Sequence, residues 1–430
     1  MGWGHGAHGA AAREALKAAL AQRRRKPDTL IVFATSPGAL GSAVSEIRRQ
    51  LGAGVRIFGG TSDSKGVLTQ QGLITGADPD VPVVAMMAIA SDEMVFGTGA
   101  ASFANYPSPA EASKAAAAQA VRSAARGPQE HPRAVLMATS AENTRQGDVL
   151  SAIASVIGPD VPAFGGRVGA AVVDETLAGD GISVAVLYTE LPVGWTFEGG
   201  YDVSSSQSGV ITRMEGEESV VEIDNRPALD VYDGWLAGGL RRLYREHPSA
   251  LAAEYLALMP LYIRHRSPRG DVYSIFSHVW PTDPLLQKKA LKVGMKMQKG
   301  ERLHLANGTW ETLLNRIANL PHAARTRGDL ETAQPILGFG YVCSGVMAVI
   351  PPAERLKAPL LMSQSLGGTP FLAGVSWGEH GFLPGVGNKF GNLLSSFLVI
   401  GPRPAAGTAG VSAAAAMRGR RRAPGDSEAP

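Results

Sequence analysis

Hydroxyl side chains follow two predicted strands at matching places in the sequence. Thr35 and Ser36 come directly after one short apolar run, and Thr139 and Ser140 come directly after another. In open α/β sheets ligands bind beyond the carboxyl ends of parallel strands, and the N-termini of the following helices favour anions. These four residues are therefore candidate ligand contacts. The alternative is that they only cap helices and turns, as Ser and Thr commonly do.

A glycine pair marks a second candidate loop in each half of this pattern. Phe58-Gly-Gly60 leads into Thr61 and Ser62, and Phe164-Gly-Gly166 leads into Arg167. Adjacent glycines let the backbone approach either a ligand or a neighbouring strand closely, and packing is the favoured interpretation. An arginine beside such a loop can clamp a carboxylate, or it can be a solvated surface residue.

The segment 376–381, Ser-Trp-Gly-Glu-His-Gly, concentrates polar groups in an apolar part of the chain. Glu379 and His380 have the side chains of an acid/base pair. Neighbouring residues of a strand point to opposite faces, however, so the two are not expected to cooperate. We expect Glu379 to fix a turn or to line a pocket.

The chain has one cysteine, Cys343, which excludes an internal disulfide framework and a multi-cysteine zinc site. A lone cysteine without a histidine at a diagnostic spacing is usually a small buried apolar residue. Gly385-Val-Gly-Asn-Lys-Phe390 breaks the dinucleotide-binding pattern, and no P-loop is present. Because we find no nucleophile with a partner base, we expect no catalytic residue, no metal, no cofactor and no enzymatic activity.

An internal repeat organises the elements that must position these residues. Val44–Gly60 aligns without a gap on Leu150–Gly166, and Ile31–Ser36 aligns on Val135–Ser140 at an offset of 104. Each copy reads as strand, helix and parallel strand, preceded by an alanine-rich helix and followed by antiparallel strands in the same sheet. We interpret the match as a duplication.

The second half of the chain predicts further elements. They are a hairpin over 209–224, a helix over 228–245, a helix capped by Thr309, and strands near 339–344 and 393–400. Pro370-Phe-Leu-Ala-Gly374 faintly echoes Pro162-Ala-Phe-Gly-Gly166, so a third, degenerate copy stays open. The predicted fold class is α/β, with two duplicated βαβ-plus-antiparallel-strand lobes followed by a C-terminal α+β domain with mixed sheets.

Composition narrows the classes of function. Of the 430 residues 45% are hydrophobic and 18% charged, which is typical of a globular protein. The net charge of +3 comes from residues 402–430, so the rest is neutral, and we expect no nucleic-acid partner. No apolar run reaches the ~18 residues of a membrane span. We predict a disordered N-terminus (1–9), domains 10–200 (repeats 10–105 and 106–200) and 201–401, and a disordered tail (402–430).

The order of these motifs resembles the FIST family. The double repeat resembles its N-terminal domain. The second half of the chain resembles the C-terminal domain of the family at several places. These are 220–232, Met297–Leu303 leading into the Trp310 helix, Tyr341–Ser344, Leu372–Glu379 and Asn392. The family is regarded as an intracellular sensory module for small ligands such as amino acids. The resemblance adds Cys343, Trp377, Glu379 and Asn392 to the candidate ligand contacts.

Two hypotheses follow. The first is a stand-alone sensor that binds an amino acid or organic acid in signal transduction. The second is a recognition or adaptor subunit that works with an F-box or ubiquitin-ligase partner. Because the first repeat begins near residue 10, we expect no cleaved targeting segment and a location in the cytoplasm.

Overall fold

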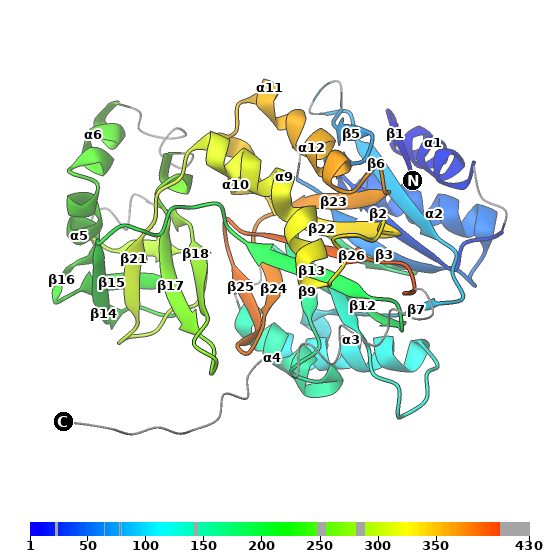
Figure 1. The fold of residues 1–430 in the computed structure, drawn as a ribbon, viewed down its shortest axis with the longest axis horizontal. Coiled ribbons are helices and arrows are strands. Elements are labelled where there is room, and N and C mark those ends of the chain that lie inside the picture. The colour runs from blue at the N-terminus through cyan, green and yellow to red at the C-terminus, as the bar shows by residue number, and fades with distance from the viewer. Residues whose placement is uncertain are drawn as a thin grey trace, which may run out of the picture.

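The computed structural model describes the chain except for residues 22–24, 64, 77, 79, 142–144, 247–254, 281–288 and 405–430. The predicted α/β fold class is confirmed: three six-stranded mixed sheets form one body, and a fourth sheet lies beside it (Figure 1). The predicted tail lies almost wholly outside the described residues. No helix among the described residues is long and apolar enough to cross a membrane.

Three lobes of the same design form the body, each built on two parallel strands and an antiparallel third. Lobe 1 contains β2 (Thr29–Ala34), α2 (Pro37–Leu51), β3 (Arg56–Thr61) and β6 (Val83–Ile89). Lobe 2 contains β8 (Ala134–Ser140), α4 (Gln146–Ile157), β9 (Ala163–Val168) and β12 (Gly181–Thr189). Lobe 3 contains β22 (Leu337–Cys343), α10 (Ser344–Val349), α11 (Pro352–Arg355), α12 (Lys357–Ser365), β23 (Phe371–Ser376) and β26 (Ser395–Ile400). The third copy left open by the sequence is therefore present.

Strand register corrects the alignment of the first strands by one residue. Ile31 pairs with Phe58, whereas Leu136 pairs with Phe164, so the structural offset there is 105 rather than 104. Ile31 and Leu136 both belong to the core between the sheets. A shift of one residue would move every buried side chain of the strand to the opposite face. The burial pattern therefore decides the alignment, although the identical residues favour the other one. Thr35, Ser140 and Cys343 are consequently equivalent.

The lobes exchange strands in a cycle. The hairpin that follows each glycine pair joins the sheet of another lobe. These hairpins are β4 (Val67–Thr69) with β5 (Gly72–Ile74) on β23, β10 (Ala171–Val173) with β11 (Thr176–Ala178) on β3, and β24 (Glu379–Leu383) with β25 (Gly387–Gly391) on β9.

Two further strands are exchanged in the opposite direction, each joining the sheet of the next lobe. β7 (Met94–Ser102) of the first repeat pairs with β12 of lobe 2, and β13 (Val193–Glu198) of the second repeat pairs with β26 of lobe 3. The expectation that β5, β7 and β13 extend the sheets of their own repeats is wrong, because their hydrogen-bonding edges belong to neighbouring lobes.

Each lobe is covered by the helix that precedes it. These helices are α1 (His8–Leu20), α3 (Pro109–Ser123) and α9 (Trp310–Arg327), and Thr309 caps the last as predicted. The predicted disorder of residues 1–9 is wrong, because β1 (Gly2–His5) pairs with β6. Gly2 and Gly4 lie flat against α1, where the backbone leaves no room for a Cβ.

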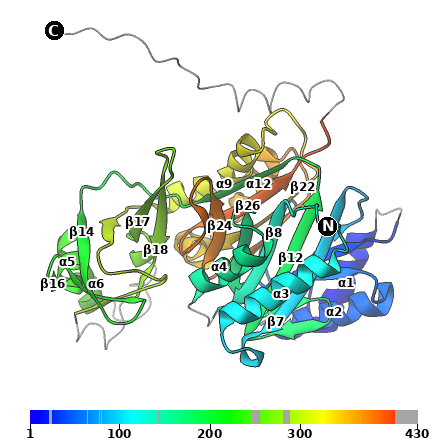
Figure 2. The same ribbon diagram turned by 90° about the horizontal axis from the view of Figure 1, so that it is seen from below.

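The fourth sheet is inserted between β13 and α9 and lies at one end of the body (Figure 2). Its strands are β14 (Ser208–Met214), β15 (Ser219–Ile223), β16 (Arg226–Pro227), β17 (Leu261–Arg266), β18 (Val272–Ser277), β19 (Val279–Trp280), β20 (Leu291–Val293) and β21 (Arg302–Leu305). The predicted hairpin of β14 and β15 is confirmed. The helix predicted over 228–245 is two helices, α5 (Ala228–Trp235) and α6 (Gly239–Glu246). Ala237 and Gly238 adopt positive φ between them and break it.

Three glycines hold the lobes together in a cycle. A Cβ on Gly60 would lie 3.5 Å from Ala138 of lobe 2, and one on Gly374 would lie 2.9 Å from Phe33 of lobe 1. A Cβ on Gly166 would lie 2.6 Å from Tyr341 of lobe 3. These equivalent contacts identify backbone packing as the role of the glycine pairs, as favoured from the sequence.

Candidate functional site

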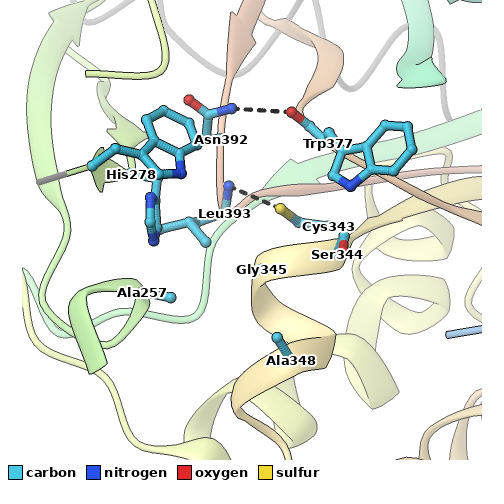
Figure 3. Close-up of a pocket in the computed structure, with 10 residues that line it drawn as sticks. Ala257, His278, Cys343, Ser344, Gly345, Ala348, Trp377, Asn392 and Leu393 are labelled. Atoms are coloured by element: carbon cyan, nitrogen blue, oxygen red, sulfur yellow. Dashed lines mark hydrogen bonds between the residues drawn. The ribbon is translucent and has the colours of Figure 1, made fainter. Parts of the chain in front are cut away.

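A cavity of about 190 Å³ lies where the inserted sheet meets lobe 3 (Figure 3). Its lining is mainly apolar with a few polar groups, the usual character of a small-molecule site. The inserted part contributes Ala257, His278 and Trp280. Lobe 3 contributes Cys343, Ser344, Gly345, Ala348, Trp377, Asn392 and Leu393.

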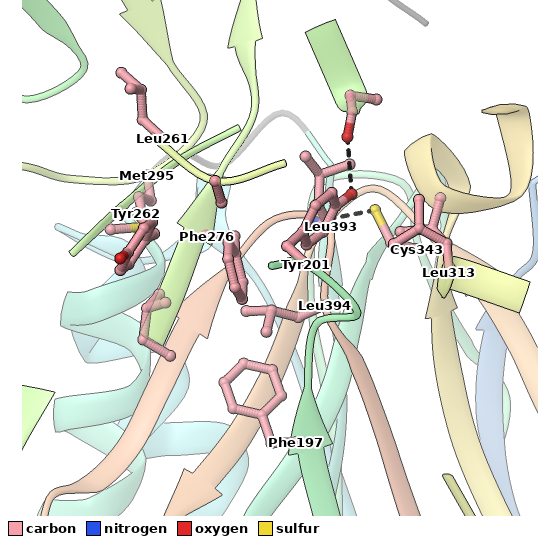
Figure 4. Packing of buried hydrophobic residues seen from close by; sticks show 14 of the residues in the cluster. Phe197, Tyr201, Leu261, Tyr262, Phe276, Met295, Leu313, Cys343, Leu393 and Leu394 are labelled. Carbon is pink, nitrogen blue, oxygen red and sulfur yellow. Dashed lines mark hydrogen bonds between the residues drawn. The ribbon is translucent and has the colours of Figure 1, made fainter. Parts of the chain in front are cut away.

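Cys343 ends β22 at the inner wall of this cavity, and its side chain is only 3% exposed. The Leu393 N–H donates to the sulfur over 3.3 Å, and apolar side chains such as Leu313 and Leu394 surround this region (Figure 4). Leu393 has φ +59°, an uncommon conformation for a large residue, and this conformation aims its N–H at the thiol. Burial, and next the charge of Glu379, raises the pKa of Cys343 well above its ordinary value.

Glu379 lies behind the cavity wall, fully buried at the start of β24. Its Oε1 accepts from the Ser376 hydroxyl at 2.9 Å and from the Gly378 N–H at 3.1 Å, so it fixes the turn as expected. Its Oε2 accepts from the Leu394 N–H at 3.3 Å. Burial raises the pKa of Glu379 to about 8 despite these donors, so the group carries its proton at neutral pH.

Asn392 and Trp377 form the outer part of the cavity. Asn392 Nδ2 donates to the Trp377 carbonyl over 3.3 Å, which orients the amide. Asn392 is 3% exposed, and its Oδ1 has no hydrogen-bond partner within the described part of the chain. Trp377 remains 42% exposed at the mouth of the cavity. A Cβ on Gly294 would lie 1.9 Å from this oxygen, so Oδ1 packs against the inserted sheet rather than facing the cavity.

Ser344 follows Cys343 on the cavity wall and is held by a residue of lobe 1. Lys65 Nζ donates to its hydroxyl over 3.0 Å and forms an ion pair with Asp63, also at 3.0 Å. The Lys65 ammonium therefore holds the Ser344 hydroxyl in place at the cavity wall.

The hydroxyl candidates of lobes 1 and 2 do not line this cavity. Thr35 Oγ1 accepts from Val83 N–H, and Ser36 caps α2 by accepting from Ala39 N–H. Thr61 Oγ1 accepts from Ala170 N–H, while Ser62 accepts from Val375 N–H and donates to the Gly66 carbonyl. Thr139 donates to Gln146, and Ser140 is buried at 1% exposure. These contacts are those of turns, caps and lobe junctions.

Arg167 is not among the residues that line the cavity. Its guanidinium donates to the Ala141 carbonyl and lies 5.9 Å from the centre of the Phe390 ring. Burial lowers the pKa of Arg167, while the charges of Glu218 and Glu379 oppose this effect. The side chain is therefore neither a solvated surface residue nor a lining residue of the cavity.

Sequence reasoning found Cys343, Trp377 and Asn392 but missed His278, Trp280, Ser344 and Leu393. Ser344 was recognisable in principle, because it occupies the position of Ser36 once Cys343 is aligned with Thr35. His278 and Trp280 come from the inserted sheet, and no local pattern announces their approach. Within the described ranges, no three His, Cys, Asp or Glu side chains are grouped so that they could hold a metal ion.

Proteins similar to this chain are found among the solved structures. No family model matches the chain, and no curated protein matches its sequence. A cyanuric acid hydrolase from A. caulinodans matches 93% of this chain and 98% of its own length, at 9% identity and a TM-score of 0.37. A second cyanuric acid hydrolase structure matches 93% of this chain and all of its own length, at 11% identity and a TM-score of 0.34.

This finding corrects one expectation. The sequence led us to expect that the chain is not an enzyme, whereas the two structures described above are both hydrolases. That expectation is withdrawn. Because both TM-scores lie below 0.5, no reaction, substrate or residue role is taken from these neighbours. The resemblance to the FIST family stays a prediction.

Proposed function

We propose that this chain binds a small organic molecule in the cavity beside Cys343 and acts as a small-ligand sensor. The observation that carries the proposal is the cavity itself, which a mainly apolar lining and a few polar residues enclose where lobe 3 meets the inserted sheet. Such a lining binds the apolar part of a small molecule, and the few polar groups orient it.

The dimensions of the cavity limit the ligand. Its volume of about 190 Å³ exceeds the ~150 Å³ of an engineered cavity that takes up benzene. Trp377 and Trp280 offer flat aromatic surfaces at its edge. A compact molecule of roughly that size, polar at one end, fits this combination. Amino acids and organic acids are the first classes to screen.

A thermal-shift screen of the full chain tests the proposal. A ligand present at about 100 times its Kd stabilises the native state by ~2.7 kcal/mol, so the melting temperature should rise and saturate. Ala348→Phe places a ring in the cavity and should abolish the shift, whereas the exposed Ala353→Phe on α11 is the matched control and should retain it.

The proposal fails if the shift is the same in the filled variant as in the wild type. It also fails if no compound of these classes gives a saturable shift. The adaptor alternative and the cytoplasmic location remain proposals on the grounds given from the sequence.

A further inference from the structure

A second cavity, of about 310 Å³, lies where the inserted sheet meets α4 and β25. The first turns of α4 and the strand β25, which lies beside β18, form its body side (Figure 1). The strands β17 and β18 and the loop that leads into β21 form its other side. Among the described residues, none lines both this cavity and the one beside Cys343. The two cavities are therefore separate binding spaces.

Ion pairs neutralise two of the charged side chains that line the second cavity. Asp148 on α4 pairs with Arg145 at 2.6 Å, and Lys296 on the opposite side pairs with Glu217. Because the protein itself supplies these counter-charges, neither Asp148 nor Lys296 requires a charged group on a ligand.

Two other lining charges, of opposite sign, have no such counter-charge. Within the described part of the chain, Lys389 of β25 and Glu301 next to β21 form no ion pair, either with each other or with another residue. Glu301 Oε2 accepts from the Gln298 N–H over 2.7 Å, which holds the carboxylate in place but leaves its charge. Both side chains are half-buried. A charge that has lost part of its hydration is stabilised by an opposite charge, so each of the two favours a ligand group of the other sign.

Apolar side chains make up much of the remaining lining. They are Leu150, Ile263, Ile275, Met295 and Phe390. His265 lies among them on β17; burial, and next the charge of Lys389, lowers its pKa, so the ring is neutral at pH 7 and adds no charge. The volume exceeds the ~150 Å³ of an engineered cavity that takes up benzene. The cavity thus has room for a short apolar skeleton.

We propose that the second cavity binds a small zwitterion, a molecule with one carboxylate and one ammonium group on a short apolar skeleton. The carboxylate lies against Lys389, the ammonium group lies against Glu301, and the skeleton packs on the apolar lining. A molecule with only one of the two charges leaves the other lining charge without a counter-charge and is discriminated against. This site goes beyond the proposed function, which uses the cavity beside Cys343.

Three matched compounds test the proposal by isothermal titration calorimetry on the full chain. L-Leucine carries both charges, 4-methylpentanoate lacks the ammonium group, and 3-methylbutylamine lacks the carboxylate. We expect saturable binding of L-leucine and binding of the other two that is about tenfold weaker or more, the effect of losing a hydrogen bond between charged groups. Equal affinity for either single-charge compound would overturn the inference, and so would the absence of L-leucine binding at millimolar concentrations.

Two variants with matched controls locate the binding. Lys389→Met keeps an unbranched side chain without its charge, and Glu301→Gln keeps an acceptor for the Gln298 N–H. Each should weaken L-leucine binding about tenfold or more, again because one charged partner is lost. Lys114→Met and Glu331→Gln, at exposed positions elsewhere, should bind L-leucine like the wild type. Wild-type affinity in Lys389→Met and Glu301→Gln, with circular dichroism showing both to be folded, would contradict the proposed site.

Ala348→Phe distinguishes this site from that of the proposed function, because it fills only the cavity beside Cys343. L-Leucine binding should persist in this variant. Loss of binding there, together with unchanged binding in Lys389→Met, would assign L-leucine to the cavity beside Cys343. That result would overturn the inference and support the proposed function. Conversely, binding that persists in Ala348→Phe but falls in Lys389→Met supports the second site whether or not the first cavity has a ligand.

Discussion

Glu379 and His380 are consecutive residues of β24, both fully buried, and they point to opposite faces of the strand. Glu379 accepts a hydrogen bond from Ser376 of lobe 3, while His380 Nε2 lies 2.7 Å from Gln146 Oε1 of lobe 2. Two consecutive residues thus place a carboxyl group behind the cavity wall and a neutral imidazole at the junction of two lobes. As the pH rises, titration of Glu379 lowers the stability of the fold, whereas titration of His380 raises it.

The first prediction concerns alkaline loss of stability. The pKa of Glu379 is raised from 4.5 to about 8, so the folded chain binds the extra proton between these values. The stabilisation is complete below pH 4.5 and is lost as the pH rises through 8, by up to ~1.4 kcal/mol per pH unit. Urea unfolding at pH 6.5 and 8.5 should show the loss in the wild type and its absence in Glu379→Gln. An equal loss of unfolding free energy between these two pH values in the wild type and in Glu379→Gln would refute the prediction.

The second prediction concerns acid. Burial lowers the pKa of His380 from 6.5 to about 3, so the fold requires the neutral ring. Its contribution is present above pH 6.5 and is lost as the pH falls toward 3. Between 4.5 and 6.5 it opposes the Glu379 effect, which predicts a plateau there. His380→Gln keeps a donor for Gln146 but cannot titrate, so its stability optimum should move to more acidic pH. An unmoved optimum in urea titrations would contradict the assignment.

The third prediction concerns the lobe junction at Gly166. Gly166→Ala places a Cβ 2.6 Å from both Tyr341 and Ser376, so it should cost ~1–3 kcal/mol or more. Gly41→Ala lies within α2, where the nearest atom to the new Cβ is 3.8 Å away, and it should stabilise by up to ~1 kcal/mol. Denaturant midpoints measure both. Equal effects in the two variants would show that the junction is not tightly packed.

The fourth prediction concerns the N-terminal strand. A Cβ on Gly4 would lie 2.4 Å from the Ala11 carbonyl oxygen, so Gly4→Ala should detach β1 from α1 and lower the melting temperature by several degrees. Gly9→Ala meets only the end of the Arg13 side chain, at 3.4 Å, and should not lower it. Hydrogen exchange at Val84 and Met86, opposite β1, gives a second readout. Unchanged melting and exchange in Gly4→Ala would mean that β1 contributes nothing.

The sequence supported the repeat well because its signal is local. The gapless match around Phe58 and Phe164 keeps strand, helix and glycine pair in one frame. The one-residue error before it arose because the identical Ala-Thr-Ser triplets outweighed the burial of Leu136. The sheet that a strand joins depends on residues far away in the sequence. The placement of β5 and β7 could therefore not be predicted from their own residues.

The sequence predicted only those residues of the site that belong to local motifs. Cys343, Trp377 and Asn392 all lie in motifs of lobe 3. His278 belongs to the inserted sheet and lies about 65 residues before Cys343 in the sequence. No residue near His278 indicates that it lines this cavity. The unusual φ of Leu393 is likewise set by the surrounding fold rather than by its own preference.

The cyclic strand exchange has a consequence for how the chain is made. The hairpin at Val67–Ile74 pairs with Phe371–Ser376, so a ribosome synthesises some 300 further residues before that edge finds its partner. Until then the first lobe presents open strand edges, the surfaces on which nascent chains aggregate. Pairings of such long sequence separation also slow folding. Assembly of the body is therefore a late, concerted event that depends on protection of the unfinished lobes during translation.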